Sequence, residues 1–239
     1  MFMAPSSQGL EPPGIPVRFM VELFQSQDFD ANLIKAKEGD VRAQYLVGAA
    51  YLYGLEAQEV EVDHEQGRYW LEKAADQGAA EAYSELARIY RNGMGVEKNA
   101  SKYEEYLAEA AERGMSSARL EIKDLYRHGD SEVGVEKNDK NYIYWLRKEA
   151  EDNHPYAMIN LAITYRQGLG VEVNLEKAFE WIMRAVDLDD IGAQYMAGEY
   201  YEKGMVVEKN LVKAYMMYDL SGTVPSTRRD ELEERMTEE

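Results

Sequence analysis

Cysteine is absent from this 239-residue chain, and proline and basic residues are scarce. Without cysteine there are no disulfides, thiolate nucleophiles, cysteine-type zinc sites or iron–sulfur clusters. Lysine and arginine number 27 against 45 aspartates and glutamates, which gives a formal net charge of −18. That charge disfavours nucleic acid and anionic membrane surfaces as main partners. No apolar run approaches the roughly 20 residues that a membrane span requires, so membrane insertion is not expected.

The N-terminal residues have no clear targeting signal. No lysine or arginine precedes Arg18, and Pro16 and Arg18 interrupt the apolar run of residues 15–20. A secretory signal needs a basic start and a longer apolar core. We therefore expect a cytoplasmic protein, with the periplasm as the alternative if a signal peptide has been removed. Residues 1–27 are predicted to form a flexible or partly helical lead-in.

The chain contains five internal repeats. An alanine begins each, and successive alanines are separated by 39, 36, 39 and 36 residues. Eight residues after the alanine comes a tyrosine, and three later a glycine, in all five repeats. A valine follows, and three residues after it comes an Asp or Asn. The glycine-to-valine distance is six in repeats one and three and three in the others, so the same turn contains three extra residues in those two repeats. The five tyrosine, glycine and Asp/Asn sets are Tyr51, Gly54, Asp63; Tyr90, Gly93, Asn99; Tyr126, Gly129, Asn138; Tyr165, Gly168, Asn174; and Tyr201, Gly204, Asn210.

Each recurring residue type has a structural reason. The tyrosine continues an apolar helical stripe, and the glycine can adopt the left-handed conformation that ends a helix. Asp or Asn is a preferred N-cap for the next helix, because its side-chain oxygen accepts a free backbone N–H. The unit is therefore a helix, a short turn and a second helix. One such hairpin cannot bury its own apolar face, so neighbouring hairpins must stack.

At these positions the sequence resembles the Sel1-like repeats, relatives of the tetratricopeptide repeat. The fourth repeat reads AMINLAITYRQGLGVEVNLEKAFEWIMRA, and the resemblance covers about residues 40–221. It implies an all-α, right-handed α-solenoid of five helix-turn-helix repeats. Residues 28–39 match the end of a second helix and are predicted to be an N-terminal half-repeat cap. Residues 222–239 are predicted to form a charged C-terminal capping helix.

No residue pattern indicates catalysis, a metal or a cofactor. The three histidines, at positions 64, 128 and 154, fall in predicted turns without metal-ligand spacing. No nucleophile elbow or phosphate-binding loop is present. We therefore predict a protein that is not an enzyme and has neither catalytic residues nor cofactors. A hydrolase is the least favoured alternative, because the Sel1-like proteins described as β-lactam hydrolases resemble a cysteine-rich subgroup.

The predicted binding site is the concave face of the solenoid. In the related tetratricopeptide fold the first helix of each hairpin lines this face, and the resemblance implies the same here. The residue after each recurring tyrosine turns about 100° from it, and in three successive repeats that residue is arginine. The corresponding residues in repeats one and five are Leu52 and Glu202. The predicted site residues are Arg91, Arg127 and Arg166 of the row, Arg88 one turn earlier, Leu52, and the flanking Tyr45, Leu120, Tyr156, Ile159 and Tyr195.

Arginines spaced by one repeat suit a protein or peptide partner that has carboxylates. The alternative is that these arginines pair with Asp or Glu of the adjacent repeat. A rival surface is the acidic outer face, where a basic partner would be attracted.

We predict an interaction scaffold, and within that class a dedicated bacterial immunity or inhibitor protein for a secreted effector such as a toxin. The alternative is a cytoplasmic or envelope signalling adaptor.

Overall fold

The computed structural model describes residues 28–223 and 226–238, which form twelve α-helices and no β-strand. Short turns join the helices, and one 3₁₀ turn (Glu56–Gln58) interrupts the first long connection. No helix in these two ranges is long and apolar enough to cross a bilayer. The predicted lead-in, residues 1–27, lies outside the described residues. The helices are α2 (Phe29–Lys37), α3 (Val41–Tyr53), α4 (His64–Asp76), α5 (Ala80–Asn92), α6 (Ala100–Glu112), α7 (Ser116–His128), α8 (Asp139–Glu151), α9 (Pro155–Gln167), α10 (Leu175–Val186), α11 (Ile191–Lys203), α12 (Leu211–Ser221) and α13 (Ser226–Glu238).

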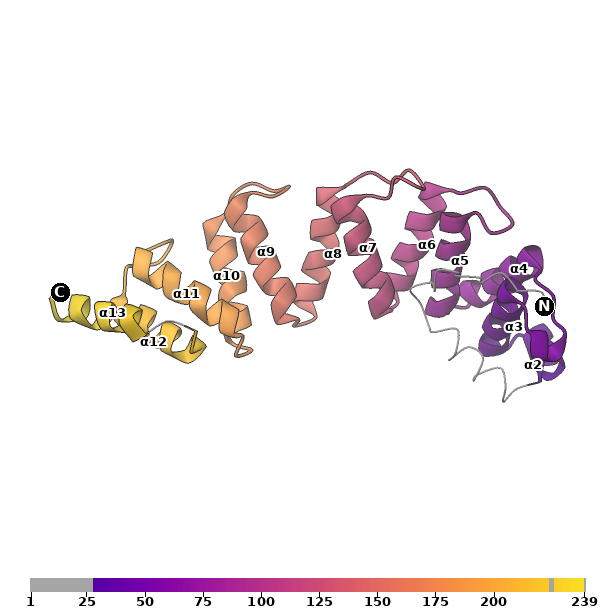
Figure 1. Ribbon diagram of the computed structural model, residues 1–239, viewed down its shortest axis with the longest axis horizontal. Helices are drawn as coiled ribbons and strands as arrows, with labels where there is room; N and C mark the ends of the chain where they lie inside the picture. Colours follow the sequence, from indigo (N-terminus) through magenta and orange to yellow (C-terminus); the bar gives the residue numbers. More distant parts are fainter. Residues whose placement is uncertain (1–27, 224–225, 239) are drawn as a thin grey trace, which may run out of the picture. The chain divides into compact units, whose positions relative to one another are not determined.

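The chain divides into two compact units. The N-terminal unit comprises residues up to 122 together with 130–135, and the C-terminal unit comprises residues 123–129 and those from 136 onward. In the N-terminal unit α3 packs against α4 and α5 against α6, and in the C-terminal unit α9 packs against α10 and α11 against α12. Successive helices also contact one another within each unit (Figure 1). Within each unit, the predicted all-helical stack of helix hairpins is thereby confirmed.

Every hairpin turn is closed by the same two interactions, which together we call the turn clasp. The backbone N–H of the Asp or Asn donates to the carbonyl of the recurring tyrosine, at 2.7–2.9 Å in all five repeats. The side-chain oxygen of the same residue accepts a backbone N–H in the first turn of the second helix, at 2.8–3.0 Å. One residue thus ties the end of the first helix to the start of the second. The predicted N-caps are confirmed at Asp63, Asn99, Asn138, Asn174 and Asn210.

The two longer turns share one local structure. Leu55 and Val60 exchange two backbone hydrogen bonds of 2.9 and 3.1 Å, and Asp130 and Val135 do the same at 2.8 and 2.9 Å. Each pair forms an isolated antiparallel bridge. The three extra residues of repeats one and three are therefore a small closed loop in front of an unchanged clasp.

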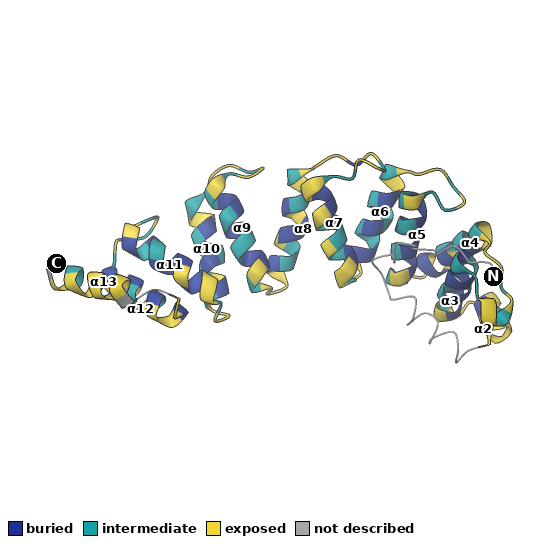
Figure 2. Cartoon of the chain, in the orientation of Figure 1, coloured by how far each residue is buried: buried dark blue, intermediate teal, exposed yellow. Residues whose placement is uncertain are grey.

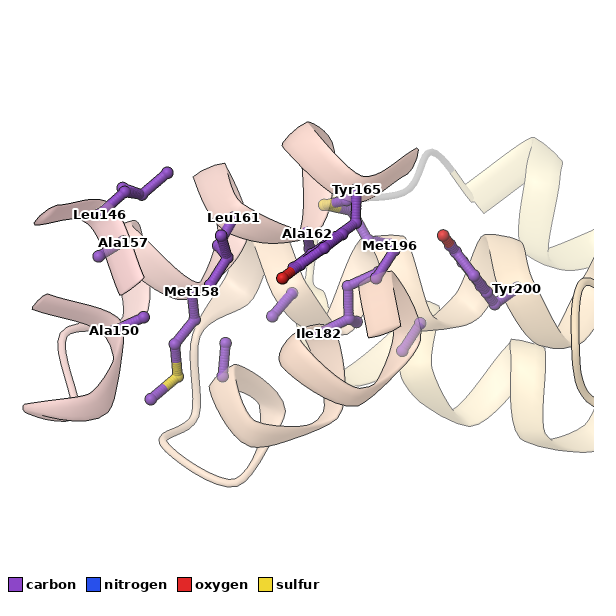
Figure 3. Close-up of a cluster of buried hydrophobic side chains, with 14 of the residues drawn as sticks. Leu146, Ala150, Ala157, Met158, Leu161, Ala162, Tyr165, Ile182, Met196 and Tyr200 are labelled. Atoms are coloured by element: carbon purple, nitrogen blue, oxygen red, sulfur yellow. The ribbon is translucent and has the colours of Figure 1, made fainter. Parts of the chain in front are cut away.

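The core of the C-terminal unit is built from alanines and large apolar side chains of α8 to α11. Leu161 and Ile182 are fully buried, and Ala162 and Ala185 let the paired helices approach closely. Figure 3 shows these side chains between the helices, with Tyr165 and Tyr200 among them. The recurring tyrosine is 6% exposed in repeats two, three and four, so it belongs to the core as predicted.

The fifth hairpin turn contains a strained valine. In repeats two and four the corresponding residue is Gly95 or Gly170, both with positive φ, and a Cβ atom there would lie 2.5 Å from the previous hairpin's second helix. Repeat five has Val206 at a φ of 56°. A β-branched residue in the left-handed region is destabilised by about 1–2 kcal/mol.

Replacing Val206 by glycine should therefore raise the free energy of unfolding. We expect a gain of about 0.5–1 kcal/mol, because relief of strain exceeds the extra backbone entropy of glycine in the unfolded chain. Guanidinium unfolding followed by circular dichroism measures it. Val173 is the matched control, since it is an exposed turn valine without a positive φ. Val173→Gly should lower stability, and a loss of stability in both variants would contradict the strain at Val206.

Candidate protein-binding surface

The predicted site residues lie on α3, α5, α7, α9 and α11, the first helices of the five hairpins. Leu52, Arg88 and Arg91 belong to the N-terminal unit, whereas Arg127 and Arg166 belong to the C-terminal unit. We call the exposed side of these helices within each unit the first-helix surface. Its residues differ in what they contact.

Arg91 is held by carboxylates of the next repeat. Its Nε donates to Asp130 Oδ2 at 3.0 Å, and its Nη1 lies 3.6 Å from Glu121 Oε1. The guanidinium carbon also lies 5.6 Å from the centre of the Tyr103 ring, whose hydroxyl donates to Glu121 at 2.9 Å. Asp130 lies in the lengthened turn of repeat three, where it forms one end of the bridge with Val135, so this turn supplies the carboxylate. Arg91 therefore joins two repeats.

Arg88 is part of a second inter-repeat network. The Tyr53 hydroxyl donates to Glu85 Oε2 at 2.5 Å, and Arg88 donates to the Tyr53 oxygen and lies 3.3 Å from Glu85. Burial, reinforced by the charge of Glu85, raises the pKa of the Tyr53 hydroxyl, so this group stays protonated and remains a donor. Only 18% of the Arg88 side chain is exposed. It ties α5 to α3 and offers little surface to a partner.

Arg166 is linked to the following repeat more loosely. Its Nη1 lies 3.7 Å from Glu199 Oε2 on α11, and 31% of its side chain is exposed. Glu199 also accepts from Lys203 at 3.1 Å. Pairing with carboxylates of the adjacent repeat, the alternative considered from the sequence, thus describes both Arg91 and Arg166.

Arg127 differs from the other arginines of the row. Its side chain is exposed, and within the described residues it has no carboxylate partner. Its guanidinium carbon lies 5.8 Å from the centre of the Tyr142 ring on α8. Burial raises the pKa of the Tyr142 hydroxyl, Arg127 opposes that shift, and Tyr156 adds to it. Arg127, Tyr142 and Tyr156 therefore form one local group where α7, α8 and α9 meet.

The predicted apolar residues other than Leu52 fall into two classes, exposed and half-buried. Tyr156, Leu120 and Tyr195 are exposed, at 73%, 60% and 42%. Tyr45 and Ile159 are half-buried. Tyr45 packs on the Leu46, Ala49 and Ala50 cluster of α3, and burial raises the pKa of its hydroxyl.

Leu52 lies in the core, so its predicted place on the binding face is wrong. It is 1% exposed. A Cβ atom on Gly67 of α4 would lie 3.1 Å from the Leu52 nitrogen. The two helices of the first hairpin approach so closely at this glycine that α4 covers Leu52.

The fifth member of the row is a buried carboxylate that holds the C-terminal helix. Glu202 is 7% exposed and accepts hydrogen bonds from the Tyr218 hydroxyl at 3.0 Å, Arg228 at 2.7 Å and Arg235 at 2.8 Å. Burial by itself would raise the pKa of Glu202. The hydrogen bonds from Arg235 and Tyr218 and the charge of Arg228 outweigh that effect and lower the pKa below its usual value. This role of Glu202 was not predicted from the sequence, although two arginines seven residues apart share one face of a helix.

The Glu202→Gln variant should bind α13 less tightly. We expect a loss of about 2 kcal/mol in the stability of the C-terminal hairpin at pH 7, typical of charged hydrogen bonds. Because the folded pKa of Glu202 is lowered, its contribution is present at neutral pH and is lost as the pH falls from about 5 through the folded pKa.

Guanidinium unfolding at pH 7, 5, 4 and 3 measures this effect. The stability difference between wild type and Glu202→Gln should shrink as the pH falls. The exposed Glu208 of the same hairpin, changed to Gln, is the control and should give a small, flat difference. A difference for Glu202→Gln that does not change with pH would contradict the role of the charge.

Comparison with known proteins identifies the repeat. The family model described as Sel1 repeat matches residues 41–78, 80–115, 155–190 and 191–222. It leaves the third hairpin unmatched, although α7 and α8 have the same turn clasp. Among the described residues, no three His, Asp or Glu side chains are grouped so as to hold a metal ion.

Several known proteins are similar over much or part of the chain. A Sel1 repeat protein of Oxalobacter formigenes is 28% identical, with a TM-score of 0.59, and the match covers 85% of this chain and 59% of that one. The protein c5321, a protective antigen of uropathogenic Escherichia coli strains with an SLR fold, is 26% identical with a TM-score of 0.54, over 81% and 40% of the two chains. The ERAD-associated E3 ubiquitin-protein ligase component HRD3A of Arabidopsis thaliana is 31% identical over 71 residues, which are 30% of this chain and 10% of HRD3A.

The chain thus spans less than two thirds of each of these proteins. The family match nevertheless covers more than half of this chain, and the helix hairpins with their capped turns agree with it. The protein belongs to the Sel1 repeat family.

Proposed function

We propose that the protein is a non-catalytic scaffold that binds another protein through its first-helix surface, and that the contact centres on α9 and α11. The observation that carries this proposal is the exposure of Tyr156, which is 73% exposed on the first turn of α9. Large exposed aromatic side chains are typical anchors of protein interfaces. In a chain with a net charge of −18, this exposed position has a large aromatic ring and not a charged side chain.

Other large side chains surround Tyr156 on the same helix turns. Ile159 lies one turn along α9, and its Cδ1 would be 3.4 Å from a Cβ on Gly192 of α11. Ile191 and Tyr195, four residues apart on α11, are 55% and 42% exposed. Because residues three or four apart share a helix face, these four side chains provide an apolar contact area. We call Tyr156, Ile159, Ile191 and Tyr195 the α9–α11 patch.

Arg127 supplies a cation near this patch. Its guanidinium is positioned on Tyr142, next to Tyr156, and has no carboxylate partner among the described residues. It can therefore pair bidentately with a carboxylate of a partner without first breaking an ion pair. Arg91 and Arg166 would have to give up Asp130 and Glu199. This difference supports Arg127, rather than the whole row, as the cationic contact.

The non-catalytic character is supported by what the polar side chains already do. Glu85 accepts a hydrogen bond from Tyr53 of the preceding repeat, and Glu202 holds α13. Glu121 and Glu199 pair with arginines of the preceding repeat. These carboxylates thus have structural roles that account for their positions without catalysis. A dedicated immunity or inhibitor protein and a signalling adaptor would both use such a binding surface, and both remain predictions. Nanomolar binding of one partner would favour the first, and micromolar exchange between partners the second.

Substitution of two tyrosines by alanine tests the proposed surface. Wild type, Tyr156→Ala/Tyr195→Ala and Arg127→Glu are used for affinity capture from a native lysate. We expect a protein that wild type retains to be lost from the first variant, with affinity lowered about tenfold or more, because anchors contribute 1–2 kcal/mol or more each. The Arg127→Glu variant should also bind this partner more weakly.

Two matched controls lie on second helices of the same unit. Tyr144→Ala removes a tyrosine that is 48% exposed on α8, and Arg184→Glu replaces an arginine that stacks on Trp181 of α10. Both should retain the partner, and circular dichroism should show unchanged helix content in all variants. Equal capture by wild type and Tyr156→Ala/Tyr195→Ala would refute the α9–α11 patch as the binding site. Loss of the partner in the control variants would indicate that the interface lies on the second helices.

A further inference from the structure

The second helix of the fifth hairpin has an exposed apolar stripe. Val212, Met216 and Leu220 on α12 are 58%, 53% and 60% exposed, and their spacing of four residues places them on one helix face. At the same distances from the N-cap, the described second helices of the other hairpins have mostly charged residues. Those residues are Glu65, Tyr69 and Lys73; Ser101, Glu105 and Glu109; Lys140, Tyr144 and Lys148; and Glu176, Glu180 and Arg184. The stripe is therefore a property of the fifth hairpin and not of the repeat.

Among residues 28–223 and 226–238, no packing contact buries the stripe. Leu211, Ala214 and Tyr218 form the buried side of α12, and Leu232 of α13 packs with them. Met217 packs against the core that α8 to α11 form. The stripe thus stays exposed although α12 packs against the preceding core on one side and against α13 on another. Figure 2 shows exposed segments between buried ones along this helix.

The charges on α12 are arranged symmetrically about Met216. Lys213 follows Val212 at one end, and Asp219 precedes Leu220 at the other. If two copies of α12 pack antiparallel about Met216, Val212 of one copy meets Leu220 of the other, and Lys213 meets Asp219. The opposed helix dipoles favour the same orientation. Lys213 is exposed, with its Nζ 5.2 Å from the centre of the Tyr201 ring, and Asp219 also interacts within its own chain.

We infer that a second copy of this chain covers the stripe, in a two-fold symmetric dimer with α12 packed antiparallel to α12. Self-complementarity is what a two-fold interface requires, since the same patch must serve both subunits. A different partner would not need apolar and charged residues placed symmetrically about one methionine. One short helix provides less than the usual interface area, so we expect micromolar or weaker self-association. This dimer is independent of the α9–α11 patch.

Sedimentation equilibrium of the full chain tests the dimer. Protein concentrations from about 10 to about 500 µM cover the range in which weak self-association is detected. Salt of about 0.3 M screens the net charge of −18 on each copy. We expect a concentration-dependent increase from monomer to dimer mass. Met216→Glu places two carboxylates at the two-fold axis and should raise the dissociation constant at least about tenfold. Tyr144→Glu, at the same position of the third hairpin, is the control and should leave it unchanged.

A charge exchange tests the antiparallel register. Lys213→Asp and Asp219→Lys should each weaken the dimer by placing like charges opposite one another, and the double variant should restore it. Melting temperatures of all variants show whether the chain is folded. A monomer at every concentration overturns the inference, as does a dimer that Met216→Glu leaves unchanged. A dimer in which the double variant is as weak as the single ones overturns the antiparallel register.

Discussion

The turn clasp is the interaction on which the rest of the structure depends. One Asp or Asn accepts an N–H with its side chain and donates its own N–H to the tyrosine carbonyl of the preceding helix. These two hydrogen bonds fix where the first helix ends and the second begins. They thereby fix which side chains meet between the helices and which face outward. Lengthening the turn by three residues leaves the clasp intact, because the extra residues close on themselves through a separate bridge.

Polar pairs between residues far apart in the sequence also join the repeats. Arg91 reaches Asp130 and Glu121, Arg166 reaches Glu199, and two arginines of α13 reach Glu202. A carboxylate thus occupies, in the last repeat, the row position that arginine occupies in repeats two to four. In this row, Arg91 and Arg166 join neighbouring repeats, and Glu202 holds the C-terminal helix. The residues that we propose for partner binding are therefore the aromatic and aliphatic side chains of the α9–α11 patch, together with Arg127.

Local signals made most of the fold predictable. Caps, helix-ending glycines and the tyrosine stripe each depend on a few neighbouring residues, so their places follow from the sequence. The pairing of Arg91 could not be assigned, because its partner Asp130 lies 39 residues away in an inserted turn. The prediction for Leu52 failed because Gly67 brings α4 close enough to cover it. Position along one helix does not reveal how closely the next helix approaches. The exposure of Tyr156 and Tyr195 agrees with their predicted positions, and their binding role stays a proposal.

Hydrogen exchange of the clasp amides tests the common turn most directly. The backbone N–H groups of Asp63, Asn99, Asn138, Asn174 and Asn210 all donate to a tyrosine carbonyl. NMR-detected exchange should therefore show all five protected at least about a hundredfold, as interior amides of stable structure are. Asn138 is decisive, because its hairpin lies outside the family match. Exchange of the Asn138 amide at the rate of an unstructured chain, with the other four protected, would contradict a clasp shared by all five hairpins.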